Sequence, residues 1–367
     1  MAPLQLNRLI SASNLIDAGK YNEAKGIVEE MVDDEQAAQW SRTWYTRGVL
    51  AQTAYRDGIR TNDKRKYELY PDQLFVAFES YEKAMELEPG RRLTKLLGPR
   101  YVQLANDFQR LGERSYNSRQ YKESLRAFEH VMEIRSRPFL DEKTDTNLVY
   151  NAALAAYEAN NFDKAVKYLG RLHQYHYSPN VTHLLHHSFL EQGDSTAARQ
   201  VLREGIGYYD KNEDLVLLLA DLMVKQNDNE SAIEVLDEAI SEDPTNYKYH
   251  NTKGLILQKT GEFRQAISAF EDALQHNPDA HATYLNIATS YYNIGVEYDM
   301  ISRTLTINRL VREQQAKAQE AFDKAASWLL RAEQVEEKSP SVEEEIQQLL
   351  RMLRVGINHS QVEEPEQ

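Results

Sequence analysis

The sequence predicts an all-α protein built from repeated helix pairs, and residues 179–280 carry the observations behind this prediction. Residues 247–260 and 263–276 are two apolar-periodic segments separated by Gly261, which indicates two helices joined by a tight turn. Pro278 closes the second segment, because proline cannot continue a helix. The same pattern occurs at 213–246 and at 179–212 without an insertion or deletion. A fixed period of this kind is typical of a solenoid, in which each unit packs only on its neighbours.

The unit at 247–280 resembles the tetratricopeptide repeat (TPR), in which small and large residues occupy fixed positions. Small residues are needed where the two helices cross, since helix axes only about 8–10 Å apart leave no room for bulk. The family's positions are filled here by Gly254, Phe263, Ala266, Phe270, Ala273 and Pro278. The resemblance implies a right-handed superhelical solenoid of about eight helix pairs with a C-terminal capping helix. At 179–212, His186 stands in the small-residue position that Gly254 fills in 247–280.

The resemblance extends over residues 5–333 and places the remaining units in order. We expect units at 5–40, 41–90, 105–138, 146–178, 179–212, 213–246, 247–280 and 281–333. Extra residues around Asp57–Pro71 lie inside the second unit, and extra residues at Gly295–Val311 should lengthen both helices of the last unit into a projecting hairpin.

An amphipathic helix is expected at 341–355, where Ser341-Val-Glu-Glu344 forms a capping-box pattern. Its Ile346, Leu349, Leu350 and Leu353 would cover the apolar end of the last unit, which a repeat array must shield from water. Together these segments define a single solenoid at 5–357. The acidic tail at 358–367 is expected to be disordered.

Composition narrows the class of protein. The chain has 367 residues, of which 41% are hydrophobic and 27% charged, enough apolar material for a core. No apolar run approaches the roughly 18 residues that a membrane span needs. Cysteine is absent, so disulfides, thiolate metal ligands and a cysteine nucleophile are excluded.

The N-terminal residues lack the basic start and apolar core of a signal peptide. The order of features is nevertheless similar to exported TPR proteins of Bacteroidetes-type bacteria, which combine a lengthened second repeat, with a run like Tyr67–Pro71, and a lengthened last repeat. That resemblance implies a periplasmic or otherwise exported protein whose signal peptide has been removed, in preference to a cytoplasmic one.

Charge is distributed unevenly along the chain. The net charge of −14 disfavours nucleic acid as a partner. Residues 91–137 nevertheless carry 11 Lys and Arg against 5 Asp and Glu. This basic segment is either a solvated face or an interaction surface. In the second case the chain could self-assemble into a homo-oligomer, with the basic segment of one copy meeting the acidic C-terminal region of another.

No enzyme signature is present: the sequence has no P-loop, His-Glu-x-x-His or Gly-x-Ser-x-Gly. Histidine is concentrated between His173 and His187, and His183 and His187 are spaced to project from one helix and share a metal. The favoured interpretation is that His186 is packed and that His183 and His187 are polar contacts. We therefore predict no catalytic residue, no cofactor and no metal, and a metal-dependent enzyme at this cluster is the least favoured alternative.

The resemblance implies that the first helix of each unit lines a concave groove. The groove residues carried over to this sequence are Arg42, Tyr45, Gln52, Asn106, Gln109, Tyr116, Asn147, Tyr150, Tyr157, Asn180, His183, His187, Lys248, Asn251 and Tyr292. Asparagine can bond to an extended backbone, and tyrosine offers apolar area with little entropy to lose. The predicted function is a non-catalytic scaffold that binds a protein or an extended peptide.

Overall fold

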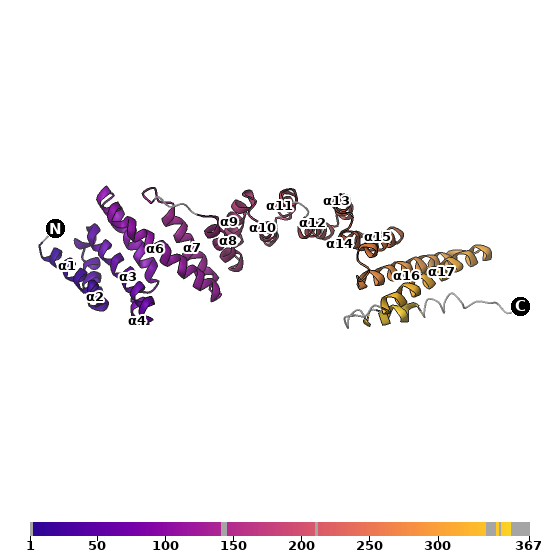
Figure 1. The fold of residues 1–367 in the computed structure, drawn as a ribbon, viewed down its shortest axis with the longest axis horizontal. Coiled ribbons are helices and arrows are strands. Elements are labelled where there is room, and N and C mark those ends of the chain that lie inside the picture. Colours follow the sequence, from indigo (N-terminus) through magenta and orange to yellow (C-terminus); the bar gives the residue numbers. More distant parts are fainter. Residues whose placement is uncertain (1–2, 141–144, 210–211, 335–342, 345, 354–367) are drawn as a thin grey trace. The chain divides into compact units, whose positions relative to one another are not determined.

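A computed structural model describes residues 3–140, 145–209, 212–334, 343–344 and 346–353 (Figure 1). Every regular element within these ranges is a helix, and successive helices pack as pairs, which confirms the all-α solenoid prediction. The chain divides into two compact units, Met1–Asp194 and Ser195–Gln367, referred to below as unit 1 and unit 2. The boundary falls inside 179–212, which the sequence treats as one repeat.

Unit 1 contains the paired helices α1/α2, α3/α5, α6/α7 and α8/α9, followed by α10, and each pair contacts the next. The helices are α1 (Pro3–Asp17), α2 (Tyr21–Asp33), α3 (Ser41–Thr61), α4 (Lys64–Tyr67), α5 (Gln73–Leu87), α6 (Arg91–Asn117), α7 (Tyr121–Arg135), α8 (Thr146–Glu158), α9 (Phe162–Gln174) and α10 (Pro179–Glu191). A single 3₁₀ turn, Ala37–Gln39, connects α2 to α3.

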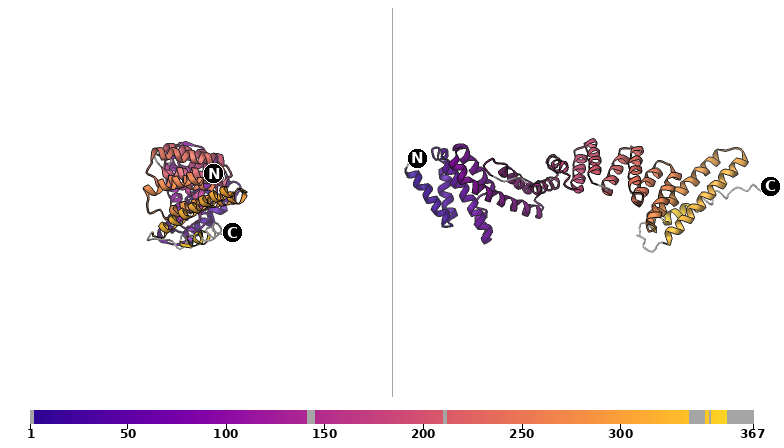
Figure 2. Two further views of the ribbon diagram at one scale, coloured as in Figure 1. Left: turned by 90° about the vertical axis from the view of Figure 1, so that its right-hand side faces the viewer. Right: turned by 45° about the horizontal axis from the view of Figure 1, so that its top comes forward.

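Unit 2 continues the same organisation with α11 and the pairs α12/α13, α14/α15 and α16/α17. The helices are α11 (Ser195–Tyr208), α12 (Glu213–Lys225), α13 (Asn229–Glu242), α14 (Tyr247–Lys259), α15 (Phe263–His276), α16 (His281–Thr304) and α17 (Asn308–Glu333). Both α16 and α17 are lengthened, as the sequence predicts, and Figure 2 shows them side by side as a hairpin.

The expected capping helix is described in part, at 343–344 and 346–353. Ile346 and Leu353 are buried in one cluster with Phe322 and Leu329 of α17, so this segment covers apolar surface of the last helix pair as expected. The ends of the expected helix and the acidic tail at 358–367 lie outside the described residues.

Close helix crossings explain why, within a pair, a glycine on one helix faces an aromatic ring on the other. A Cβ on Gly254 would lie 2.5 Å from the nearest atom of the Phe270 ring, which is fully buried. The same arrangement joins Gly112 of α6 to Phe128 of α7, at 2.7 Å. Real Cβ atoms do not approach other atoms this closely, so the crossing requires glycine at these positions. The repeat pattern in the sequence is therefore a packing requirement.

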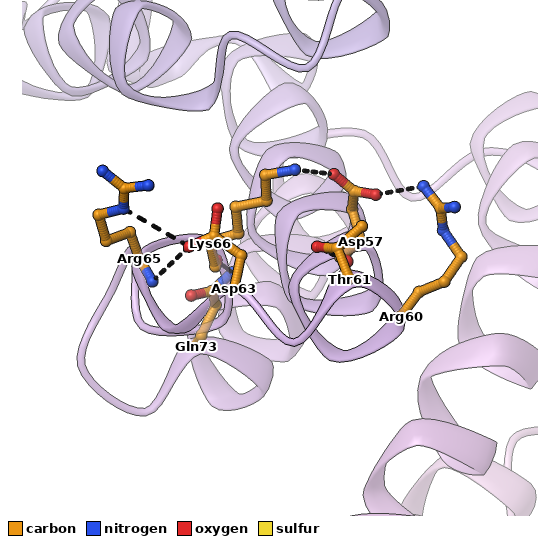
Figure 3. A network of polar contacts seen from close by, with 7 residues as sticks. All are labelled: Asp57, Arg60, Thr61, Asp63, Arg65, Lys66 and Gln73. Atoms are coloured by element: carbon orange, nitrogen blue, oxygen red, sulfur yellow. Dashed lines mark hydrogen bonds and ion pairs between the residues drawn. The ribbon is translucent and has the colours of Figure 1, made fainter.

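The insertion after α3 is an ordered extension of unit 1. The helix α3 runs on to Thr61, and the short helix α4 folds back against it. Asp57 accepts hydrogen bonds from Lys66 Nζ at 2.7 Å and from an Arg60 guanidinium nitrogen at 2.6 Å (Figure 3). Asp63 caps α4, since its Oδ1 accepts from the backbone N–H of Arg65 at 3.1 Å.

Asp57 should make stability depend on pH. The hydrogen bond from Lys66 lowers the pKa of this carboxyl below its ordinary value of 3.8, and Arg60 adds to the shift. A lowered carboxyl pKa stabilises the fold above the unfolded pKa, and this contribution is lost as the pH falls through the folded pKa. Asp57→Asn should therefore cost about 1 kcal/mol at neutral pH and progressively less below pH 3.8.

Urea denaturation of both proteins across acidic and neutral pH measures this difference. Asp17→Asn, at an exposed carboxylate at the end of α1, is the control and should leave the stability unchanged. A constant difference between Asp57→Asn and the parent at all pH values would contradict the electrostatic explanation.

The helix α6 is longer than the sequence predicts. The expected unit starts at residue 105, whereas α6 begins at Arg91. Pro99 lies inside the helix on its exposed side and removes only one backbone hydrogen bond there. Leu93, Leu97 and Tyr101 are buried on the opposite side, and their burial holds the extra turns in place.

Candidate peptide-binding face

Aromatic and amide side chains gather where α8 meets the start of α10 in unit 1. The ring of Tyr150 stacks on Tyr177 with centroids 5.2 Å apart. The hydroxyl of Tyr177 donates to Asn147 Oδ1 at 2.9 Å, and Asn180 Nδ2 donates to the hydroxyl of Tyr150 at 3.1 Å. The predicted groove residues Asn147, Tyr150 and Asn180 are thus brought together. Tyr177 completes the group and was missed, because it lies in the linker between α9 and α10.

Tyr157 and His187 form the next contact along the same two helices. The Tyr157 hydroxyl lies 3.2 Å from His187 Nδ1, and the two rings are 5.6 Å apart. Phe162 supports the tyrosine ring from α9, at 6.1 Å. Burial raises the pKa of Tyr157, and the nearby carboxylates Glu158 and Glu191 raise it further. Tyr157 therefore stays a neutral hydroxyl that can donate or accept a hydrogen bond.

Tyr116, at the end of α6, extends this surface toward the preceding helix pair. Its ring meets Tyr121 edge-on at 5.3 Å. Burial raises the pKa of Tyr116, with smaller contributions from Glu158, Tyr121 and Tyr150. We name the combined surface the tyrosine face, and its members are Tyr116, Asn147, Tyr150, Tyr157, Tyr177, Asn180 and His187. The four tyrosines are half-buried, so each keeps part of its ring accessible.

Gln52 does not line the groove, so the prediction for this residue is wrong. It is fully buried, accepts a hydrogen bond from the Tyr81 hydroxyl at 2.8 Å and donates to the Arg100 carbonyl at 3.2 Å. The unexpected extra turns of α6 supply that carbonyl. Gln52 therefore joins α3 to α6 and is not available to a ligand.

The other predicted groove residues of unit 1 lie outside the tyrosine face. Tyr45 is half-buried beside Tyr81, with centroids 6.3 Å apart. Gln109 accepts from Arg135 at 3.1 Å and donates to Glu113 at 3.1 Å. The remaining three are exposed: Arg42, Asn106 and His183.

In unit 2 the predicted groove residues link neighbouring helices. Lys248 forms an ion pair with Glu213 of α12. Asn251 Oδ1 accepts a hydrogen bond from Thr283 of α16 at 2.9 Å. Tyr292 packs on Phe322, with centroids 5.6 Å apart. These contacts are structural, and the aromatic and amide cluster of unit 1 has no counterpart among the predicted groove residues described in unit 2.

The histidine segment packs into the fold. His173 is 4% exposed with Nδ1 2.9 Å from the Thr182 hydroxyl, and His186 is 5% exposed. Within the described ranges, no group of three or more His, Cys, Asp or Glu side chains is placed to hold a metal ion. The described helices also include none that is long and apolar enough to cross a membrane.

Comparison with known proteins identifies repeats in the middle of the chain. Models of the tetratricopeptide repeat match residues 148–176, 189–256 and 247–280. The chain thus contains TPR repeats, as the sequence analysis predicts, and one match coincides with the predicted unit at 247–280.

Two curated proteins are similar over part of their length. The TPR repeat-containing protein YpiA of Bacillus subtilis (strain 168) is 24% identical over 189 residues, which is 51% of this chain and 42% of YpiA. Protein y4yS of Sinorhizobium fredii is 26% identical over 113 residues, 31% of this chain and 60% of y4yS. The chain therefore spans less than two thirds of each relative it matches.

Among solved structures, a crystal structure of MamA is 16% identical in sequence. The match covers 61% of this chain and 94% of the MamA chain, with a TM-score of 0.29. The TPR2AB domain of yeast Sti1, in its complex with pHSP90, is 15% identical; the match covers 69% of this chain and 99% of the Sti1 chain, with a TM-score of 0.26.

Proposed function

We propose that this protein is a non-catalytic scaffold that binds an extended segment of a partner protein on the tyrosine face of unit 1. The observation that carries the proposal is the placement of Tyr116, Tyr150, Tyr157 and Tyr177 beside Asn147 and Asn180 on one accessible surface. The TPR repeats support a binding role, because such arrays present long surfaces made of successive units.

The chemistry of this face suits an extended polypeptide. Tyrosine supplies a large contact area with only two rotatable side-chain bonds, and asparagine offers both a donor and an acceptor to a partner's backbone. The hydrogen bonds from Tyr177 to Asn147 and from Asn180 to Tyr150 already hold these side chains in place. Less conformational entropy is then lost on binding, which favours affinity.

Affinity capture from the native host tests the proposal. The double variant Tyr150→Ala/Tyr157→Ala should lose partners that the unmodified protein retains, with affinity for a purified partner falling at least about tenfold. Tyr175→Ala is the matched control, because Tyr175 is 66% exposed in the α9–α10 linker and outside the tyrosine face. Equal capture by the double variant and the control would overturn the assignment of this face.

We also propose that the protein acts in the periplasm or another exported location. The support is the similarity in feature order to exported TPR proteins. Cell fractionation of the native host, with recovery of the protein only in the cytoplasm, would contradict it.

A further inference from the structure

Unit 1 contains a second candidate site, an arginine-lined groove between α3 and α6 with a volume of about 760 Å³. Its basic lining consists of Arg56 and Arg60 of α3 and Arg100, Arg110 and Arg114 of α6. Arg56 and Arg60 lie in or beside the lengthened end of α3, and Arg100 lies in the unexpected extra turns of α6. The groove is therefore built largely where this chain departs from the regular repeat. Its residues are distinct from the tyrosine face, so this inference does not rest on the proposed function.

Two of the five arginines already have carboxylate partners. Arg60 bonds to Asp57, which also binds Lys66 (Figure 3). Arg56 Nε lies 3.7 Å from Oδ2 of Asp107, a side chain that is 5% exposed. These two acids hold their cations in place.

Among the described residues, no carboxylate lies within ion-pair distance of the remaining three arginines, although the charges of Arg110 and Arg114 also act on Asp107. The guanidinium groups of Arg100 and Arg110 make no hydrogen bond or ion pair with any described residue, and Arg114 donates to the Tyr55 hydroxyl at 2.5 Å and to a backbone carbonyl. Glu113 also lines the groove, but its carboxylate accepts a hydrogen bond from Gln109 and offsets only one of the three charges. A guanidinium stays protonated at every accessible pH, so the groove keeps a positive surplus.

We infer that this arginine groove binds a carboxylate-rich segment of a partner protein. The planar guanidinium fork matches the two oxygens of a carboxylate and can hold them with parallel hydrogen bonds. A concave surface of one charge sign also concentrates ligands of the opposite sign. Tyr21, Tyr55 and Ile59 line the same groove and offer apolar contact to the side-chain stems of a peptide. A groove of this volume has room for several residues, far more than one small anion occupies.

Fluorescence anisotropy with a labelled hexaglutamate peptide tests this inference on the full chain. The double variant Arg100→Gln/Arg110→Gln should bind the peptide about tenfold more weakly, because two unpaired guanidinium groups are removed. The matched control is Arg91→Gln/Arg92→Gln, which makes the same change of charge on exposed residues of the same helix, outside the groove. The control should bind nearly as well as the parent.

A variant that removes a negative charge from the groove distinguishes an electrostatic effect on binding from a structural effect of the substitutions. Glu113→Gln removes an exposed carboxylate from the groove and should tighten peptide binding by about twofold to threefold. Thermal unfolding checks that each variant folds, and the exposed single variant Arg110→Gln carries the test if the double variant does not fold.

Three results would overturn the inference: equal binding by the groove variant and its matched control, weaker binding by Glu113→Gln, or equal binding of a hexaglutamine peptide. Competition with inorganic phosphate distinguishes a carboxylate-rich peptide from a small anion as the ligand of the groove. Displacement of the peptide by phosphate at comparable concentration would reassign the groove to small anions and overturn the peptide proposal.

Discussion

Gly112→Ala should destabilise unit 1 by about 2 kcal/mol, although alanine is the better helix former. The added Cβ would lie 2.7 Å from Cε1 of Phe128 and 2.9 Å from two other ring atoms. Phe128 is 2% exposed, so its ring has no free space into which to move. The two helices α6 and α7 must then separate, and the loss of packing exceeds the gain in helix propensity of about 1 kcal/mol. Urea denaturation measures the change in the free energy of unfolding.

Gly170→Ala is the matched control in the same compact unit. Gly170 lies inside α9, and a Cβ there would have no atom within 4 Å. Only the propensity gain remains, so this variant should be more stable than the parent by about 0.5–1 kcal/mol. A second variant, Gly112→Ala/Phe128→Leu, shrinks the ring that causes the clash and should cost less than the two single changes added together. Stabilisation by Gly112→Ala would show that the crossing does not require glycine.

These glycine and phenylalanine positions could be predicted because they are local. The crossing of two consecutive helices brings together residues only 16 apart, such as Gly254 and Phe270, and Gly112 and Phe128 are separated by the same number of residues. Much of the tyrosine face could be predicted for the same reason, since Asn147 and Asn180 occupy matching positions in their units. Tyr177 lies in a linker, where a repeat pattern says nothing, and only the structure places it on this face.

The arginine groove could not be predicted, because its charge depends on contacts between distant residues. The sequence shows a basic surplus at 91–137 but not which of these arginines are already paired. Arg126 binds Asp72 and Arg137 binds Glu82, each more than 50 residues away in sequence. Arg100 and Arg110 are indistinguishable from them in the sequence and yet form no ion pair with any residue that the structure describes. Gln52 failed as a groove residue for a related reason, since its partner Arg100 belongs to a helix extension that Pro99 obscured.

Gln73→Leu should destabilise unit 1 by about 3 kcal/mol, because one buried amide joins the insertion to the repeat. Gln73 is 4% exposed, and its Nε2 donates to the carbonyl oxygens of Ala51 at 2.8 Å and Lys66 at 3.0 Å. Its Oε1 accepts from the backbone N–H of Tyr70 at 3.3 Å. Leucine has a similar volume but no polar atom, so packing is largely kept while these backbone groups lose a partner away from water.

The effect should be concentrated in the insertion, which gives a readout that general loss of packing would not. Hydrogen exchange at the backbone amides of Lys66 and Tyr70 should become faster, because the insertion can open without unfolding the helix pairs. Gln174→Leu makes the same chemical change at an exposed position of α9, away from the insertion, and should stay within about 0.5 kcal/mol of the parent. Equal stability of the two variants, or unchanged exchange at Tyr70, would mean that the insertion is held by the Asp57–Lys66 contact alone. In that case Asp57→Asn should produce the faster exchange that Gln73→Leu does not.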